Sequence, residues 1–471
     1  MSRLLALATV GVVAFLCVPG PVKVAWPETP NEVIETIEPE DLPEIEEEPE
    51  DLSLGPDWLD QLAQNAAIEA DQLGPPPVME LPLGGELADA PSTESVAAPA
   101  FAHRIYPSRY PRRNQRVGLT GRGDNEASAR AVAMALAWLA RQQKADGGWE
   151  FDQGDRVDRV SATAFAILPY LAVGEAHKHR RNRVKDYSRC IAAGLGFLMR
   201  NCAASGPSAG RMSPNMQTQS LATLALVEDY AMTKDAIIKP YAQFAIDYLQ
   251  KAQGPNGGWG EVRGAYGDIF VTGWAIQALY AAQLSEELAV DERVIKRAVK
   301  FLDSIAAGTS KSMYGVATNK DARPGTTPTA IGLLCRDCIN SWGPNHPGLI
   351  DGVAGFVENR PSEKNRDPLY VYYATCVLWA KQGEEWVEWN AGAQQADGRR
   401  RGGVRDLLVN LQSKADGRTH GSWEPEGAFG ERYGRLGTTA MSVLTLEVYY
   451  RHLPIAKDGA DGKGDKIPKA K

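Results

Sequence analysis

One small motif recurs through most of this chain and limits the folds that it can adopt. A threonine, or once a tyrosine, stands near the start of an apolar helical run, as in SATAFAILPYL and FVTGWAIQAL. Successive positions lie 55, 54, 57, 44 and 66 residues apart. Periods of this length are typical of stacked supersecondary units, none of which can bury its apolar face alone. The positions are Thr163, Thr218, Thr272, Thr329, Tyr373 and Thr439.

Amphipathic helical segments such as ALAWLARQQ, GLGFLMRN and AIDYLQKAQ alternate with these apolar runs. A helix that is apolar on all sides belongs inside a fold, and an amphipathic helix can cover it. No alternation typical of strands competes with this interpretation. The pattern therefore predicts an all-α fold over residues 127–453, an α/α toroid of about six helical hairpins with an inner and an outer ring.

A second motif, Leu-x3-Gln-x3-Gly-x-Trp, occurs twice in full, as LARQQKADGGW and LQKAQGPNGGW, and once more with an insertion. A buried glutamine amide can bond backbone groups at a helix end. A tryptophan adds a large apolar contact, and the glycines allow a tight turn. We expect these residues to act as structural clamps between units. The pairs are Gln143 with Trp149, Gln253 with Trp259, and Gln412 with Trp423.

The second motif resembles the QW repeat of squalene and hopene cyclases. Over about residues 127–453, the chain is similar to the terpenoid cyclase and protein prenyltransferase superfamily, and it looks closest to exported squalene-cyclase-like repeat proteins. The resemblance implies an α/α toroid in which the QW residues are structural. It also implies two chemistries to look for: alkene protonation by an Asp-x-Asp-Asp-Thr-Ala motif, and zinc-assisted thiol chemistry.

The acidic motif of the cyclases is absent before every recurrent threonine. Asp268 alone matches one aspartate of that motif, while Asp158 and Asp367 are looser analogues, and a role as helix N-caps is favoured for all three. If the chain is catalytic, Asp268 is the candidate acid. The candidate ligand-binding faces are aromatic residues that core packing would also explain, namely Trp274, Tyr372 and Tyr373.

Zinc chemistry is not predicted, because no His stands where that family places its ligand and Cys335 with Cys338 lack two further ligands. We expect these cysteines to be buried thiols, and we expect no cofactor and no nucleic acid. Glycan hydrolysis by paired carboxylates is a third class. Acidic residues follow the motif tryptophans, but arginines intermingle with them, which favours surface ion pairs. They are Glu150, Asp152, Asp155, Asp158, Glu261, Asp268, Glu424, Glu426 and Glu431.

The N-terminal part has a different composition. The apolar run at residues 4–18 is shorter than the roughly 20 residues of a membrane span and fits the hydrophobic region of a signal peptide. Residues 1–25 are therefore expected to be a signal peptide or a short anchor. Residues 1–103 carry a net charge of −18 and the remainder +10. We predict a disordered acidic, Pro-rich leader at 26–103, a basic linker at 104–126 and a polar tail at 454–471.

Two hypotheses for function follow. The first is an exported toroid that binds an apolar or polymeric ligand without the known catalytic motifs. The second is an isoprenoid-handling enzyme with an altered acid. The enzyme requires a deep, enclosed cavity with a buried carboxyl at its mouth, whereas a binding scaffold has a filled centre. The expected partners are an apolar or isoprenoid ligand or another envelope protein, and membrane association through the N-terminus stays open.

Overall fold

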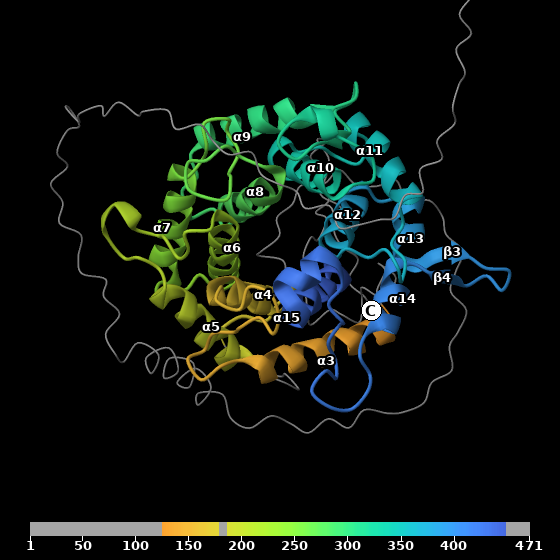
Figure 1. Ribbon diagram of the computed structural model, residues 1–471, viewed down its shortest axis with the longest axis horizontal. Helices are drawn as coiled ribbons and strands as arrows, with labels where there is room; N and C mark the ends of the chain where they lie inside the picture. Colours follow the sequence, from red (N-terminus) through yellow and green to blue (C-terminus); the bar gives the residue numbers. More distant parts are fainter. Residues whose placement is uncertain (1–124, 179–185, 449–471) are drawn as a thin grey trace, which may run out of the picture. The chain divides into compact units, whose positions relative to one another are not determined.

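The computed structural model describes residues 125–178 and 186–448, and these residues form two concentric rings of helices (Figure 1). Each inner helix packs on the next along the chain, and the last packs back on the first. The predicted α/α toroid is therefore confirmed. The inner helices are α4 (Arg159–Ala172), α6 (Met216–Thr233), α8 (Ile269–Leu284), α10 (Thr327–Asn340), α12 (Pro368–Lys381) and α15 (Gly427–Leu446).

The outer helices each precede the inner helix with which they form a hairpin. They are α3 (Glu126–Gln142), α5 (Ser188–Arg200), α7 (Ile238–Lys251), α9 (Glu292–Ile305), α11 (Pro347–Glu358), and the pair α13 (Glu384–Ala391) and α14 (Val404–Leu411). The described residues also contain two 3-10 turns, η2 (Gly206–Ser208) and η3 (Asn319–Asp321), and two short antiparallel pairs, β1 (Ala306–Ala307) with β2 (Met313–Tyr314) and β3 (Gly392–Gln394) with β4 (Arg400–Gly402).

Burial separates the two rings as the sequence pattern predicts. In the inner helix α8, 12 of 16 residues are buried, because it contacts neighbours on nearly every side. In the outer helix α9, only five of 14 are buried, and Val294, Ala298, Phe301, Leu302 and Ile305 form a single stripe. Burial on nearly all sides explains why α8 carries no charged residue.

The sixth hairpin departs from the predicted repeat. Its outer half consists of two helices, α13 and α14, which the β3–β4 hairpin separates (Figure 1). Only α14 was expected, from the apolar pattern of DLLVNLQ. The additional residues account for the spacing of 66 between Tyr373 and Thr439, the longest in the series.

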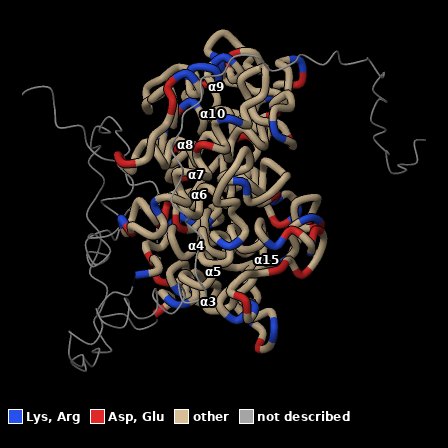
Figure 2. Tube along the Cα trace, turned by 90° about the vertical axis from the view of Figure 1, so that its left-hand side faces the viewer, with Lys and Arg blue, Asp and Glu red and all other residues tan. Residues whose placement is uncertain are grey.

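Several sequence predictions fall outside the described residues. The signal peptide or anchor, the acidic leader, nearly all of the basic linker and the polar tail lie within 1–124 and 449–471. Within the two described ranges, no helix combines the length and apolarity needed to cross a membrane. Lys and Arg residues are interspersed with Asp and Glu over the ring (Figure 2).

Candidate functional site: the mouth of the toroid

The motif glutamines and tryptophans make the same backbone contacts in all three copies. Trp259, which is completely buried, donates its indole N–H to Leu249 O at 2.8 Å and its backbone N–H to Thr272 Oγ1 at 2.9 Å. Gln253 donates to Gly257 O at 2.8 Å and to Val294 O of the next outer helix at 2.9 Å. The clamp therefore joins the third hairpin to the fourth.

The other two copies repeat this geometry. Gln143 bonds Gly147 O and Cys190 O, joining the first hairpin to the second. Gln412 bonds Gly421 O and Ala131 O of α3, which closes the ring. The recurrent threonines take part as well. Backbone N–H groups of Trp149, Trp259, Tyr314 and Trp423 donate to Thr163, Thr272, Thr329 and Thr439.

Each motif glycine is required at its position for two reasons. Gly257 has φ +88°, a backbone conformation that side chains disfavour. A Cβ there would also lie 2.2 Å from Arg297 O in α9. Gly147 and Gly421 combine a positive φ with an equally close approach to the next outer helix. The glycine thus lets one hairpin touch the backbone of the following hairpin.

We expect Gln253→Ala to lower the free energy of unfolding by roughly 1–3 kcal/mol, because Gly257 O and Val294 O lose a buried donor. Gln283→Ala is the matched control, since Gln283 is exposed on the same hairpin. The midpoints of urea unfolding measure both variants. Equal midpoints would show that Gln253 is not a clamp residue.

The centre of the toroid is filled by aromatic side chains. Phe165 of α4 meets Trp274 of α8 with ring centroids 6.3 Å apart, although α6 separates these helices in the ring. Trp274 stacks on Tyr372 of α12 at 6.1 Å and meets Tyr373 edge to face at 5.5 Å. Gln277 bonds both tyrosine hydroxyls, at 3.3 and 2.7 Å. Rings from helices across the toroid therefore touch at the axis.

Trp274, Tyr372 and Tyr373 were expected as ligand-binding faces, but the structure places them in this core. Their exposed fractions are 1%, 0% and 0%, and none lines the cavity described below. The reason is their depth. They lie in the second turn of their helices, where rings from opposite sides of the toroid are close enough to pack together.

Two further rings reach the axis from an unexpected kink. Helix α15 is interrupted at Gly434, whose φ is +60° and ψ −161°. The turn before the kink brings Phe429 and Tyr433 against Phe165, with centroids 6.1 and 5.2 Å apart. After the kink, Asp152 from the first hairpin accepts the Leu436 N–H at 3.2 Å. This carboxylate therefore caps the part of α15 that follows the kink, and it joins the first hairpin of the ring to the last.

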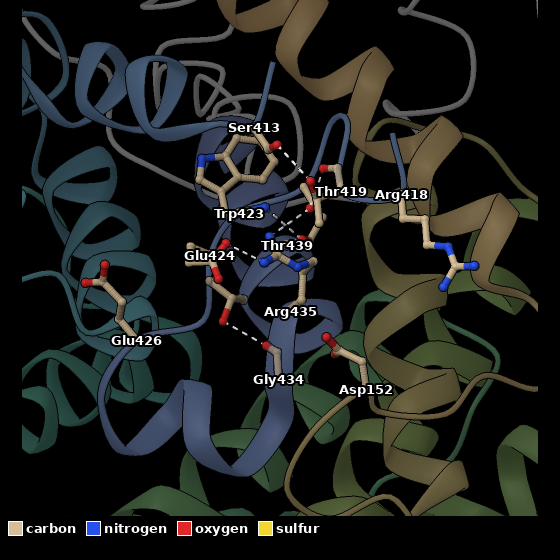
Figure 3. Close-up of polar contacts among 12 residues, drawn as sticks. Asp152, Ser413, Arg418, Thr419, Trp423, Glu424, Glu426, Gly434, Arg435 and Thr439 are labelled. Atoms are coloured by element: carbon tan, nitrogen blue, oxygen red, sulfur yellow. Dashed lines mark hydrogen bonds and ion pairs between the residues drawn. The ribbon is translucent and has the colours of Figure 1, made fainter. Parts of the chain in front are cut away.

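Figure 3 shows this contact between the first and the last hairpin, with Asp152 close to Gly434 and with Arg435 beside Glu424. Arg435 forms an ion pair with Glu424 and donates to Ser422 Oγ at 3.2 Å. Other rim acids also have partners. Lys144 pairs with Glu150 at 3.6 Å, and Asn215 donates to Glu261 at 3.4 Å. Glu424, Glu150 and Glu261 are therefore each bonded to another side chain of the rim.

The inner helices begin at one end of the toroid, and five of the six have side-chain caps there. The caps are Asp158, Asn215, Asp268, Thr326 and Asp367. The Asp268 carboxylate accepts the N–H groups of Phe270 and Val271 at 2.8 and 3.0 Å. Burial raises its pKa, and the charge of Glu261 adds to this, while the two backbone bonds oppose it.

Asp158 has a similar environment. Burial raises its pKa, against hydrogen bonds from the Thr218 hydroxyl at 2.5 Å and the Ser161 N–H at 3.0 Å. Neither Asp158 nor Asp268 lines the cavity, whereas Asp367 does. The candidate acid Asp268 is therefore bonded within its own helix end and does not line the cavity.

A cavity of about 800 Å³ lies at this end, above the aromatic centre. It is lined by residues at the N-terminal ends of five inner helices and by the loop before α12. Its aromatic residues are Phe270, Tyr370, Phe429 and Tyr433, and its neutral polar residues are Gln217, Thr326, Thr327, Asn359 and Asn365. Its charged residues are Lys364, Arg366, Asp367, Glu426 and Arg432. Sequence reasoning missed most of these, since they belong to loops without a motif.

Possible metal ligands are not clustered in the described part of the chain. There, no three His, Cys, Asp or Glu side chains are grouped so that they could hold a metal. None of the five cysteines in the same ranges forms a disulfide, and Cys335 and Cys338 are buried in α10 as expected. Burial raises the pKa of Cys335 to about 12. This thiol is therefore neutral near pH 7.

No protein-family model matches the chain, and no curated protein matches it. Among solved structures, it is similar to an alpha-1,6-mannanase from Salegentibacter sp., at 12% identity and TM-score 0.44, over 68% of this chain and 98% of that one. It is also similar to the type II terpene cyclase MstE from Scytonema, at 14% identity and TM-score 0.45, over 70% and 100%. Likenesses at this level say nothing about what this chain binds.

Proposed function

We propose that this chain is a binding toroid that holds a segment of an extended polysaccharide across its mouth. The observation that carries the proposal is the filled centre. Phe165, Trp274 and Tyr372 meet at the axis, and the cavity above them is open. An open cavity suits a polymer that enters on one side and leaves on the other.

The cavity lining favours a polysaccharide over an apolar ligand. Phe270 and Phe429 are half-buried and line the cavity, so part of each ring faces the ligand. The C–H groups on the face of a sugar can contact such rings, because the face of an aromatic ring is negatively polarised. The surrounding amides and hydroxyls, among them Gln217, Asn365 and Thr326, suit the hydroxyl groups of a sugar.

The alternative, an isoprenoid-handling enzyme, has weaker support. Protonating an alkene requires a neutral carboxylic acid that faces an enclosed apolar space. Asp268 has a raised pKa, but it caps α8 and lies outside the cavity lining. The open mouth is also lined by five charged residues, which would be desolvated at a cost by an isoprenoid chain.

Affinity electrophoresis of the full chain in mild detergent tests the binding function. Gels would contain dextran, mannan, alginate or polygalacturonate. We expect retardation by at least one polymer and a fivefold to tenfold weaker affinity in Phe270→Ala, because one aromatic contact contributes about 1 kcal/mol. Tyr266→Ala is the control, since Tyr266 is 76% exposed on the adjoining loop and outside the cavity.

Two results would contradict the proposal: no retardation by any polymer, or equal weakening in both variants. Incubation with squalene and analysis of the products tests the alternative. We expect no cyclic triterpene. Cyclic products that disappear in Asp268→Asn would replace the binding function with the enzymatic one.

A further inference from the structure

The charges of the mouth do not cancel. Of the five charged residues that line the cavity, Arg366 and Glu426 form an ion pair with each other. Asp367 caps α12 by accepting the Leu369 N–H at 3.0 Å, and it also accepts the Thr327 hydroxyl at 3.2 Å. Arg366 and Glu426 therefore neutralise each other and Asp367 is held by hydrogen bonds, while the five side chains, three cations and two anions, carry a net charge of +1.

The two charges that remain are both positive. Lys364 and Arg432 are exposed, and neither forms an ion pair with any residue in the described ranges. The Arg432 guanidinium lies over the Tyr433 ring, 5.1 Å from its centroid. Arg432 also interacts electrostatically with Asp158. That carboxylate accepts hydrogen bonds from the Thr218 hydroxyl and the Ser161 N–H, and it does not line the cavity.

The two cations come from different parts of the wall. Lys364 belongs to the loop between α11 and α12, and Arg432 to the turn of α15 that precedes the kink. Phe429, one helical turn before Arg432, lines the same cavity. A polymer that crosses the mouth can therefore meet a positive charge from each of two separate segments and an aromatic ring next to one of them.

We infer that the polysaccharide of the proposed function is anionic, a polyuronate whose carboxylates are bound by Lys364 and Arg432. This inference rests on the proposed function. A polyuronate presents a carboxylate on every acidic sugar, so cations on separate segments can be engaged at once. A guanidinium can bind a carboxylate through two parallel hydrogen bonds, and an ammonium acts as a point charge.

Affinity electrophoresis of the full chain tests the inference with polygalacturonate, alginate and hyaluronan, each compared with its carboxyl-reduced form. We expect at least one polyuronate to bind about tenfold more tightly than its reduced form, since each exposed ion pair contributes about threefold. The double variant Lys364→Gln/Arg432→Gln should lose this preference. The charge-conserving variant Lys364→Arg/Arg432→Lys should retain it.

A matched control separates a local effect from bulk charge. Lys251→Gln/Lys300→Gln removes the same charge from exposed positions on the outer helices α7 and α9, and it should bind like the parent. Equal losses in the two glutamine doubles would overturn the inference. Melting temperatures establish that every variant is folded, which is expected because all four side chains are exposed.

The remaining outcomes distinguish the two proposals. Binding of dextran or mannan with no preference for any polyuronate over its reduced form would overturn the inference and leave the proposed function intact. Binding of none of these polymers would overturn both. Poly-glutamate binding as tightly as the polyuronates, with the same loss in Lys364→Gln/Arg432→Gln, would mean that the ligand is an acidic peptide and not a polysaccharide.

Discussion

Trp259→Ala is expected to lower the free energy of unfolding of the toroid by roughly 3–5 kcal/mol, the range for truncating a buried aromatic side chain. The Trp259 side chain is completely buried, and its indole N–H is bonded to Leu249 O. Alanine would leave a cavity between α7 and α8 and remove the donor. The residue also holds its hairpin in register, through the bond between its backbone N–H and Thr272.

Tyr266→Ala provides the comparison, because it removes an aromatic ring of similar chemistry that is 76% exposed seven residues further along. Its urea midpoint should match that of the parent, while the midpoint of Trp259→Ala falls. Similar midpoints for Trp259→Ala and the parent would refute the structural role of the motif. A fall of the same size in Tyr266→Ala would place the effect in the loop instead of the clamp.

The helical repeat could be predicted because backbone geometry imposes it on the sequence. Whereas the Thr218 hydroxyl donates to Asp158, the hydroxyls of four of the five recurrent threonines accept a backbone N–H from the segment before the inner helix, as Thr163 does from Trp149. The same bond recurs at Thr329, where the donor is Tyr314 and no motif glutamine is present. A contact that recurs in four of the six hairpins fixes a residue type at a regular spacing, and such spacings are visible in a sequence.

The second hairpin brings a glycine close to the next outer helix, as the motif does, but without the motif residues. There, Gln219 of the inner helix α6 donates to Gly210 O at 2.9 Å, and a Cβ on Gly210 would lie 1.9 Å from Phe244 O in the next outer helix. The glutamine comes from the opposite side of the loop, nine residues after the glycine. A search for Leu-x3-Gln-x3-Gly-x-Trp cannot find this arrangement, in which the glycine approaches the next outer helix but the glutamine bonds only within its own hairpin.

The mouth could not be predicted in the same way. An apolar pattern shows which face of a helix is buried, but not how deep along the axis a given ring lies, so Trp274 was expected at a ligand and is in the core. The kink at Gly434 depends on an unusual backbone conformation that the Gly residue permits but does not require. Lys364 and Arg432 become a pair only because the ring brings distant segments together.

A buried charge cluster at the opposite ends of α4 and α6 gives the second large expected effect. His177, 4% exposed, lies between two carboxylates: its Nδ1 is 2.6 Å from Asp229 Oδ2, and its Nε2 is 3.0 Å from Asp235 Oδ2. Lys178 is 3.3 Å from the same Asp235 oxygen. Burial alone would lower the pKa of His177, but the charges and hydrogen bonds of the two aspartates raise it to about 9.

The sign of the pH dependence follows from this shift. An unfolded histidine loses its proton near pH 6.5 and folded His177 near pH 9, so the stabilisation is complete below pH 6.5 and is lost between 6.5 and 9. A shift of this size corresponds to about 3 kcal/mol. The buried thiols Cys190 and Cys202, with pKa values of about 11 and 12, begin to lower the stability only near pH 9.

We therefore expect the parent to lose about 3 kcal/mol of stability between pH 6.5 and 9, and His177→Gln to be less stable than the parent by about the same amount at pH 6. The difference between the two proteins should shrink as the pH approaches 9, because the parent then loses the charge that the variant lacks. Urea midpoints at half-unit pH intervals measure both curves.

His346→Gln is the control. Burial lowers the pKa of His346, and this residue is remote in sequence from the cluster, so the variant should lose stability between pH 6.5 and 9 as the parent does. A fall of the same size in His177→Gln would mean that another group titrates over this range and that the cluster does not hold a charged imidazole.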